Sequence, residues 1–363
     1  DEVANMLTGK RILVTGAAGS IGSELVRQIA SFAPSAMMLI DQAETPQHDM
    51  KLLMQNKFPS VECSVILASI ANEERMDKLF ASFKPDYVFH AAAYKHVPMM
   101  EDNPSESIQN NVYGTKVIAD LSVKYGAKKF VMVSTDKAVN PTNVMGCSKR
   151  ICEIYTQSLN AKLLQQYQAN GSAGAPPTQF VTTRFGNVLG SAGSVIPLFT
   201  RQIQAGGPVT VTDPNIIRFF MLIPEACKLV LEAGTQGKGG EILVFDMGEP
   251  VKISDLAKRM IKLSGATDVK IVYTGLRPGE KLYEEVLGTE EDTLPSFHEK
   301  IRVAKVQEYD FEQVKHDIDE LILLAHGFDN MAIVRKMKAI VPEFISKNSV
   351  YSVLDQQPAP SAH

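Results

Sequence analysis

A hydroxyl, an acid and an amine stand side by side at Thr135, Asp136 and Lys137. Side chains of these types can orient a substrate and transfer protons to and from it. They directly follow an apolar, β-branched run at 129–134, which is typical of a buried parallel strand. Ligands of open α/β sheets bind beyond the carboxyl ends of the strands. We therefore predict that this segment carries the chemistry.

A glycine-rich turn supplies a second kind of chemistry, the binding of phosphate. Gly16, Gly19 and Gly22 follow a predicted strand and open a predicted helix. Such glycines permit a tight turn, a close approach to pyrophosphate and close helix–strand packing, and the helix N-terminus adds partial positive charge. Asp41 ends the next strand, where a carboxylate can hold ribose hydroxyls. These features predict a dinucleotide site rather than a purely structural turn, and Asp41 favours NAD because it would repel the 2′-phosphate of NADP.

Strands and helices that alternate along the chain position these groups. The strand patterns lie at 11–15, 36–41, 64–68, 87–91, 129–134 and 179–185. The helical patterns lie at 20–31, 45–56, 72–83, 105–125 and 143–168, with two more near the end at 311–325 and 331–341. This alternation predicts an α/β fold, a Rossmann-type doubly wound parallel sheet with a smaller C-terminal substrate lobe.

The predicted elements become shorter and more mixed after about residue 190, and this change indicates the domain organisation. We expect an NAD-binding domain at 1–180, with strand 179–186 and later segments returning to it. A mainly substrate-binding lobe is expected at 187–345 and a flexible tail at 346–363.

Composition narrows the class of protein. The chain has 363 residues, with 37 basic and 41 acidic side chains, and a net charge of −4 argues weakly against a nucleic-acid partner. Four cysteines without a CxxC pair predict neither a disulfide framework nor structural zinc, and we expect no metal site. No apolar run reaches the ~18 residues of a membrane span. Because the chain does not begin with methionine, we expect a fragment of a longer protein, without membrane contact of its own.

Further motifs carry a family resemblance. Lys149 lies on the long predicted helix, with Met145 one turn before it on the same face. With the glycine turn and the order of elements, this helix resembles the extended short-chain dehydrogenase/reductase superfamily, which normally has tyrosine where Met145 stands. The stretches at 93–98, 184–191 and 277–281 narrow the resemblance, over roughly 5–345, to the UDP-N-acetylglucosamine 4,6-dehydratases of polysaccharide biosynthesis. The methionine variant is similar to their large, membrane-anchored branch.

The resemblance implies a reaction and roles. A dehydratase of this kind oxidises the sugar C4 with a tightly bound, recycled NAD, removes the C5 proton, and loses water from C6. By correspondence with related hexose dehydratases, Asp136 is the acid and Lys137 the base, although ordinary pKa values of ~4 and ~10.4 do not suit those roles. A desolvated site or a nearby cation would favour the neutral amine, and an ionised Asp136 would oppose it.

The base for the C4 hydroxyl stays open, since the thioether of Met145 cannot accept a proton at neutral pH. Thr135, a water molecule, or Lys149 through a relay could take its place. Our hypothesis is that Thr135 orients the C4 hydroxyl while Lys149 holds the nicotinamide ribose. The predicted cofactor contacts are Gly16, Gly19, Ser20, Ile21, Gly22, Asp41, Ala91, Ala92 and Lys149.

The expected substrate is UDP-N-acetylglucosamine (UDP-GlcNAc). Cations or amides should hold its diphosphate, for which we consider Arg277, Arg218, Asn187 and Lys95, while Glu280 could accept from the uridine ribose. The complete predicted set is Lys95, His96, Asn187, Ser194, Val195, Pro197, Arg218, Arg277 and Glu280.

Finer expectations also come from the resemblance. They are retention of configuration at C5, a homo-oligomer, and a location at the cytoplasmic face as part of an inner-membrane-anchored protein. Two alternatives remain: a nucleotide-sugar 4-epimerase, and a catalytically inactive NAD-binding regulatory module.

Overall fold

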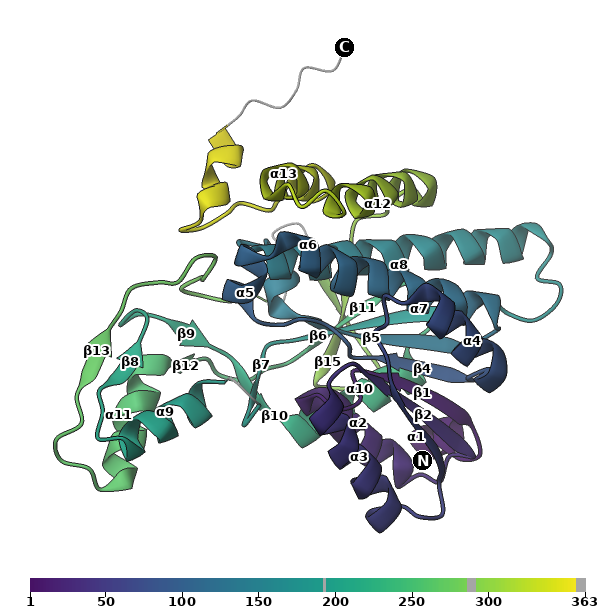
Figure 1. Cartoon of the computed structure of the whole chain (residues 1–363). Helices are drawn as coiled ribbons and strands as arrows, with labels where there is room; N and C mark the ends of the chain where they lie inside the picture. The colour runs from purple at the N-terminus through teal and green to yellow at the C-terminus, as the bar shows by residue number, and fades with distance from the viewer. Residues whose placement is uncertain (192–193, 286–291, 357–363) are drawn as a thin grey trace.

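A computed structural model of the chain describes residues 1–191, 194–285 and 292–356. Its centre is one twisted sheet whose described strands lie in the order β14-β15-β11-β6-β5-β4-β1-β2-β3 (Figure 1). These strands are β1 (Arg11–Thr15), β2 (Ala36–Asp41), β3 (Glu62–Leu67), β4 (Tyr87–His90), β5 (Lys129–Thr135), β6 (Gln179–Phe185), β11 (Ile242–Phe245), β14 (Asp292–Pro295) and β15 (Ile301–Lys305).

The pairing of the strands confirms the predicted Rossmann-type sheet. All pairs from β3 across to β11 are parallel, whereas β15 pairs antiparallel with β11 and β14 closes that edge. Because β1 lies between β2 and β4, the order of the strands reverses there, which creates a crevice beyond their carboxyl ends. The strands from β1 to β6 are largely buried, as their continuous apolar runs predict, but β3 at the edge is only partly so.

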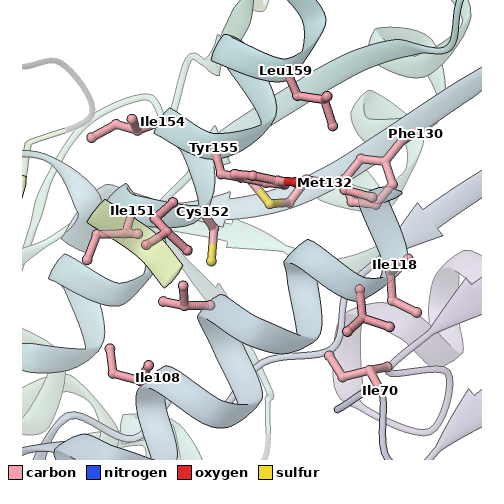
Figure 2. Close-up of a cluster of buried hydrophobic side chains, with 14 of the residues drawn as sticks. Ile70, Ile108, Ile118, Phe130, Met132, Ile151, Cys152, Ile154, Tyr155 and Leu159 are labelled. Atoms are coloured by element: carbon pink, nitrogen blue, oxygen red, sulfur yellow. The ribbon is translucent and has the colours of Figure 1, made fainter. Parts of the chain in front are cut away.

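Helices cover both faces of the sheet. One face carries α1 (Glu2–Leu7), α2 (Ser20–Ala30), α3 (Glu44–Lys57) and α10 (Ile223–Gln236). The other carries α4 (Glu73–Phe83), α7 (Gly114–Lys124) and α8 (Val144–Ala169), and α12 (Phe311–Ala325) and α13 (Asn330–Ile340) form a further layer over α8. Figure 2 shows part of the core of this second face, to which Ile151 and Tyr155 of α8 and Phe130 and Met132 of β5 belong.

The predicted helix at 105–125 is divided. After α5 (Val97–Asp102), a short α6 (Pro104–Glu106) passes into the π-helix η1 (Ser107–Tyr113), and α7 follows without a break. The π-helix contains the buried Asn111, whose side chain bonds to the loop after β4. Local π-helices occur often at functional sites, and helical periodicity alone does not reveal them.

A smaller lobe leaves the sheet after β6. It contains α9 (Val195–Gln204), β8 (Val209–Val211), β9 (Ile217–Arg218), β12 (Val251–Lys252), α11 (Ile253–Ser264) and β13 (Ile271–Tyr273). The strands β7 (Asn187–Leu189) and β10 (Phe220–Leu222) pair where the lobe meets the sheet. Phe199, Val209 and Ile253 belong to a separate small core. Other elements within 187–345, namely α10, β11, β15, α12 and α13, pack on the sheet or on α8.

The described part of the expected flexible tail is ordered. Residues 346–356 end in the short 3-10 helix η3 (Val350–Gln356). Tyr351 is 3% exposed, and its hydroxyl donates to the carbonyl of Glu101 at 3.1 Å. Lys338 of α13 binds Asp355 at 2.7 Å. The buried tyrosine explains the difference from the prediction, whereas 357–363 lie outside the described residues. Among the described helices, none combines the length and apolar character that crossing a bilayer requires.

Candidate functional site

The turn between β1 and α2 leaves no room for side chains at Gly16 and Gly22. Gly16 has a φ of +66°, and a Cβ there would lie 2.6 Å from the backbone of Ala91 and Ala92. A Cβ on Gly22 would lie 1.9 Å from the carbonyl oxygen of Gly16. Gly19 is the N-cap of α2 and makes no side-chain cap bond, and the N-terminus of a helix favours an anion. The turn therefore has the close approach that a pyrophosphate needs.

A pocket opens in front of this turn. Of the predicted cofactor residues, Gly16, Gly19, Asp41, Ala91 and Ala92 line it. Residues that the sequence analysis did not select complete the lining; they are Ile40, Gln42, Ala68, Ile70, Ala93 and Asn110. Oδ2 of Asp41 accepts from the amide of Ala18 at 3.1 Å, which ties the acid to the glycine turn. A pocket lined by both a glycine turn and a carboxylate fits a dinucleotide.

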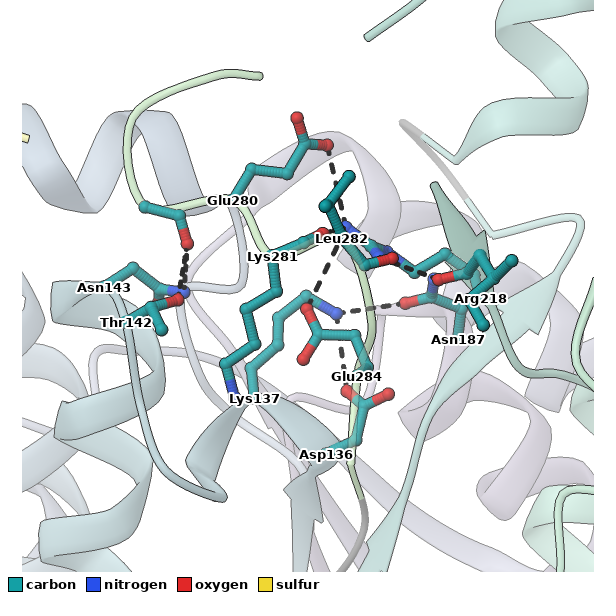
Figure 3. A network of polar contacts seen from close by, with 12 residues as sticks. Asp136, Lys137, Thr142, Asn143, Asn187, Arg218, Glu280, Lys281, Leu282 and Glu284 are labelled. Atoms are coloured by element: carbon teal, nitrogen blue, oxygen red, sulfur yellow. Dashed lines mark hydrogen bonds and ion pairs between the residues drawn. The ribbon is translucent and has the colours of Figure 1, made fainter. Parts of the chain in front are cut away.

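The predicted catalytic residues meet where β5 ends. Thr135 closes β5 and caps the 3-10 turn η2 (Asp136–Ala138), and its hydroxyl donates to Oδ1 of Asp136 at 3.2 Å. Nζ of Lys137 lies 3.4 Å from the same Oδ1 and donates to Oδ1 of Asn187 at 3.1 Å (Figure 3). The structure thus brings four predicted residues together, but Asn187 contacts the amine of Lys137 rather than standing alone as a substrate contact.

The second oxygen of Asp136 is held in a confined place. Asp136 is 1% exposed, and its Oδ2 has no hydrogen-bond partner among the described residues. A Cβ on Gly186 would lie 2.8 Å from this Oδ2, so a residue without a side chain is needed there. Buried carboxyl oxygens are normally hydrogen-bonded, which makes this atom one that a substrate hydroxyl could satisfy.

Helix α8 carries the other two predicted residues into the interior. Asn143 caps the helix by accepting from the amide of Gly146 at 2.7 Å. Met145 is 3% exposed and packs in the large core. Lys149 is 5% exposed, and burial lowers the pKa of its amine, although the charge of Glu153 opposes that change.

Burial and the charge of Lys149 also lower the pKa of His90 to about 3, so this histidine is neutral in the folded protein. Its ring lies in a buried row between Thr15 at 2.6 Å and Thr115 at 2.8 Å.

Two further residues, which no sequence motif singled out as reactive, lie close to Asp136 and Lys137. Lys281 donates to the carbonyl of Val139 at 2.7 Å, and burial lowers the pKa of its amine. Burial raises the pKa of Glu284, while the charges of Lys137, Arg218 and Lys281 act in the opposite sense. We call Asp136, Lys137, Lys281 and Glu284 the acid–amine cluster. Lys281 lies in the stretch that carried the resemblance, but no motif pointed to Glu284.

The predicted substrate arginines lie in different surroundings. Arg218 is 7% exposed, and it donates to the carbonyls of Ile217 at 2.8 Å and of Lys281 at 2.7 Å. Glu280 lies 3.7 Å from Arg218 and 3.6 Å from Arg277. Arg277 is largely exposed. Arg218 therefore holds the loop of Lys281 in place, and Arg277 is the accessible guanidinium of the two.

Lys95, His96 and Arg277 form an exposed group of basic side chains. Burial lowers the pKa of His96, and the charges of Lys95 and Arg277 lower it further, which places the three groups near one another. Asn111 of η1 supports the loop that carries Lys95 and His96, since its side chain bonds to both the amide and the carbonyl of Tyr94 at 2.8 and 3.1 Å. The remaining predicted residues Ser194, Val195 and Pro197 lie at the start of α9 in the smaller lobe.

Within the described ranges no group of three or more His, Cys, Asp or Glu side chains is arranged to hold a metal ion. The arrangement that is present offers a dinucleotide pocket beside a buried acid and amine, with basic side chains at an exposed edge. This combination can bind a nucleotide and transfer protons.

Comparisons with known proteins agree with this geometry. Residues 12–306 match the family model described as polysaccharide biosynthesis protein. The capsular polysaccharide biosynthesis protein CapD of Staphylococcus aureus is 48% identical over 88% of this chain and 52% of its own length. The chain thus spans about half the length of that relative.

Smaller relatives differ in the reaction that their names state. The inverting UDP-N-acetylglucosamine 4,6-dehydratase of Campylobacter jejuni is 33% identical over 80% of each chain. The UDP-glucose 4-epimerase of Rickettsia canadensis is 34% identical over 79% of this chain and 80% of its own. Both names describe enzymes that act on nucleotide sugars.

Among solved structures, that of Pen from Bacillus thuringiensis is similar with a TM-score of 0.72 and 29% identity, covering 87% of this chain and 99% of that one. The resemblance to the extended short-chain dehydrogenase/reductases is confirmed. From the match over residues 12–306, together with these relatives, the chain belongs to the polysaccharide biosynthesis protein family.

Proposed function

We propose that the protein dehydrates UDP-GlcNAc to a UDP-2-acetamido-2,6-dideoxy-4-hexulose, with retention at C5, and is thus a hydro-lyase. The observation that carries this proposal is the pair of Asp136 and Lys137, with Nζ 3.4 Å from Oδ1, at the carboxyl end of β5. A 4-epimerase needs only oxidation and reduction at C4. An additional acid and amine suit the loss of water between C5 and C6.

The cofactor of this proposal is NAD. Gly16 and Gly19 would take its pyrophosphate and Asp41 its adenosine ribose, while Lys149 would hold the nicotinamide ribose. When bound, NAD would supply reversible hydride transfer, from C4 of the sugar and back to C6, so that the reaction would have no net redox change. The carboxyl of Asp41 accepts from two backbone amides, which fixes its position, and a carboxylate there would repel a 2′-phosphate.

Lys137 and Asp136 divide the proton transfers of the dehydration. Once C4 is a ketone, the C5 proton is acidic, and the amine of Lys137 takes it. Asp136 gives a proton to the C6 hydroxyl, which leaves as water. Lys137 then returns its proton to C5, and delivery to the same face gives retention. The general acid and base of such steps each contribute about 10²- to 10⁴-fold to the rate.

Thr135 replaces the absent tyrosine as the residue that orients the C4 hydroxyl. Its Oγ1 donates to Oδ1 of Asp136 at 3.2 Å, and this bond gives the C4 proton a path toward a carboxylate. Met145 lies in the core and takes no part in proton transfer.

The diphosphate of the substrate is held by the exposed basic group of Lys95, His96 and Arg277. Two cations near His96 already lower the pKa of that ring, and an anionic ligand would relieve their mutual repulsion. Arg218 positions the loop of Lys281, because its guanidinium donates to the carbonyls of Lys281 and Leu282. Ser194, Val195 and Pro197 remain proposed contacts of the uracil, and Glu280 a proposed contact of the uridine ribose.

The deciding experiment incubates the protein with NAD and UDP-GlcNAc and follows the product by mass spectrometry and proton NMR. The proposal expects loss of one water and the signals of a 4-keto-6-deoxy sugar. The C5–H coupling pattern then reports retention or inversion. A product of unchanged mass with inverted C4 would instead establish the epimerase, for which the Rickettsia relative is the specific support. No change in the substrate would favour the regulatory module.

That the protein forms a homo-oligomer, and that it lies at the cytoplasmic face of a membrane, both remain predictions.

A further inference from the structure

Glu284 is a buried carboxyl that neither the fold nor the reaction scheme above explains. Its side chain is 3% exposed, and its Oε2 is buried without a hydrogen-bond partner among the described residues. Its Oε1 lies 4.0 Å from Nη2 of Arg218, at the outer limit of an ion pair. A buried carboxylate with so little direct support is costly to retain, which calls for a reason other than stability.

Arg218 does not supply that reason. Its guanidinium donates to the carbonyls of Ile217, Leu282 and Lys281 at 2.7–3.3 Å, and Glu280 provides a second, closer carboxylate. Arg218 is therefore held without Glu284. The carboxyl of Glu284 is consequently available to act on its other neighbours.

Those neighbours are the catalytic groups. In Figure 3 the side chains of Glu284 and Lys137 point into the same region of the site, and the charge of Lys137 acts on the carboxyl of Glu284. The charged or titratable groups that act on Glu284 are Lys137 and Asp136 after β5, Arg218 of β9, and Lys281 of its own loop. Asn187 of β7 holds the same Lys137 amine at 3.1 Å. The amine thus has the carboxyl of Asp136 at 3.4 Å and that of Glu284 as a further charged neighbour, and the two carboxyls come from separate segments.

We propose that Glu284 is a positioning residue of the dehydration step, whose carboxylate faces the Lys137 ammonium in the resting enzyme and so sets the pH at which that amine becomes a base. The inference rests on the proposed function, because it assigns Lys137 the C5 proton. Asp136 cannot serve this purpose alone, since it must carry the proton for the C6 hydroxyl. With the carboxylate of Glu284 nearby, the positive charge of the Lys137 ammonium remains compensated when Asp136 is protonated.

The test is the pH profile of kcat in three full-length variants. Removing a negative charge near an ammonium lowers the pKa of that ammonium. Glu284→Gln is therefore expected to move the acidic limb of the profile to lower pH by about one unit, whatever happens to the height of the plateau. Glu284→Asp, with its carboxyl drawn back by one methylene, should move the limb less in the same direction.

Glu285→Gln is the matched control, because the neighbouring Glu285 is exposed and bonds to Asn140 at 2.8 Å. This variant should leave the limb in place. If Glu284→Gln lowers kcat uniformly and leaves both limbs where they were, Glu284 is only structural and the inference is wrong. Should the Gln variant fail to fold, the Asp variant decides on the same criterion.

A second measurement separates this inference from the proposed function. Competitive acetylation of lysines over a range of pH, read by mass spectrometry, gives the pKa of Lys137 without any substrate. A lower pKa in Glu284→Gln, and an unchanged one in Glu285→Gln, supports the inference even if UDP-GlcNAc is not the substrate. An unchanged pKa in both overturns it even if dehydration is observed.

Discussion

Two clusters of buried charge lie side by side at the ends of β5 and β6. In the Glu153 cluster, the carboxylate of Glu153 accepts from Arg184, Arg150 and Ser134, with distances of 2.7–3.2 Å. In the acid–amine cluster, just beyond the end of β5, the carboxyl of Asp136 lies 3.4 Å from Lys137 and that of Glu284 lies 4.0 Å from Arg218, and one oxygen of each carboxyl has no partner in the described residues.

The pKa values of the two buried glutamates show the same contrast. Burial raises the pKa of Glu153, but the charges of Arg184 and Arg150 outweigh it and bring the pKa below its usual value. Burial also raises the pKa of Glu284, and there the neighbouring cations do not compensate. A fully satisfied cluster holds two strands and α8 together. An incompletely satisfied one keeps groups whose protons can move, and so it is the one suited to chemistry.

Removing the amine of the acid–amine cluster should have the largest effect. We expect Lys137→Ala to lower kcat by about 10²- to 10⁴-fold, since the base for C5 is lost. Its urea midpoint should stay close to that of the native protein. Lys258→Ala, at an exposed position of α11, is the control and should keep full activity. More than a tenth of native activity in Lys137→Ala would contradict its role.

Breaking the Glu153 cluster should instead affect folding. Arg184→Met leaves Glu153 with a poorly compensated buried charge, and we expect the free energy of unfolding to fall by about 3–5 kcal/mol. Urea denaturation measures this loss. Arg201→Met, at an exposed position of α9, should change it by less than about 0.5 kcal/mol. A native-like unfolding curve for Arg184→Met would remove the distinction between the clusters.

Met145 should behave as a core residue, not as a member of the acid–amine cluster. Met145→Leu conserves volume, so we expect a cost below about 1.5 kcal/mol and dehydration within about tenfold of native. Met145→Ala should retain measurable activity at temperatures where it is folded. Activity losses as large as that of Lys137→Ala would show that the thioether takes part in the reaction.

The dependence of stability on pH should have opposite signs in the two clusters. Glu153 has a folded pKa below the unfolded value of about 4.3, so its stabilisation is present above that pH and is lost as pH falls through the folded pKa. Glu284 has a raised folded pKa, so its stabilisation is present below about pH 4.3 and is lost as pH rises through the folded pKa.

Urea unfolding from pH 3 to pH 8 tests these signs. Glu153→Gln should therefore become less stable relative to the native protein as pH rises, whereas Glu284→Gln should become more stable relative to it. Parallel trends in the two variants would show that the clusters do not differ in this way.

Much of this arrangement could be predicted from the sequence where the determinants are local. The glycines at 16, 19 and 22 and the acid at 41 act within one βαβ unit, and the structure places three of these four on the pocket. Thr135, Asp136 and Lys137 are adjacent in the chain, so their meeting needs no knowledge of the tertiary fold.

The parts that could not be predicted depend on distant segments. Glu284 reaches the catalytic group only because the loop after the smaller lobe returns to the end of β5, where Lys281 binds the carbonyl of Val139. The same loop buries Arg218, which we expected at the diphosphate, by offering it backbone carbonyls. Neither the position of Glu284 nor the burial of Arg218 can be predicted from the spacing of residues along the chain.

Gly186 lies close to the carboxyl of Asp136, the acid of the acid–amine cluster. It follows β6 and is not itself reactive, yet even a methyl group at this position would press on Oδ2 of Asp136. Position 186 is therefore restricted to glycine by the carboxyl of a residue that follows another strand. In a saturation mutagenesis experiment this glycine should tolerate replacement as poorly as a reacting residue does, and such intolerance would map the wall of the active site without any bound ligand.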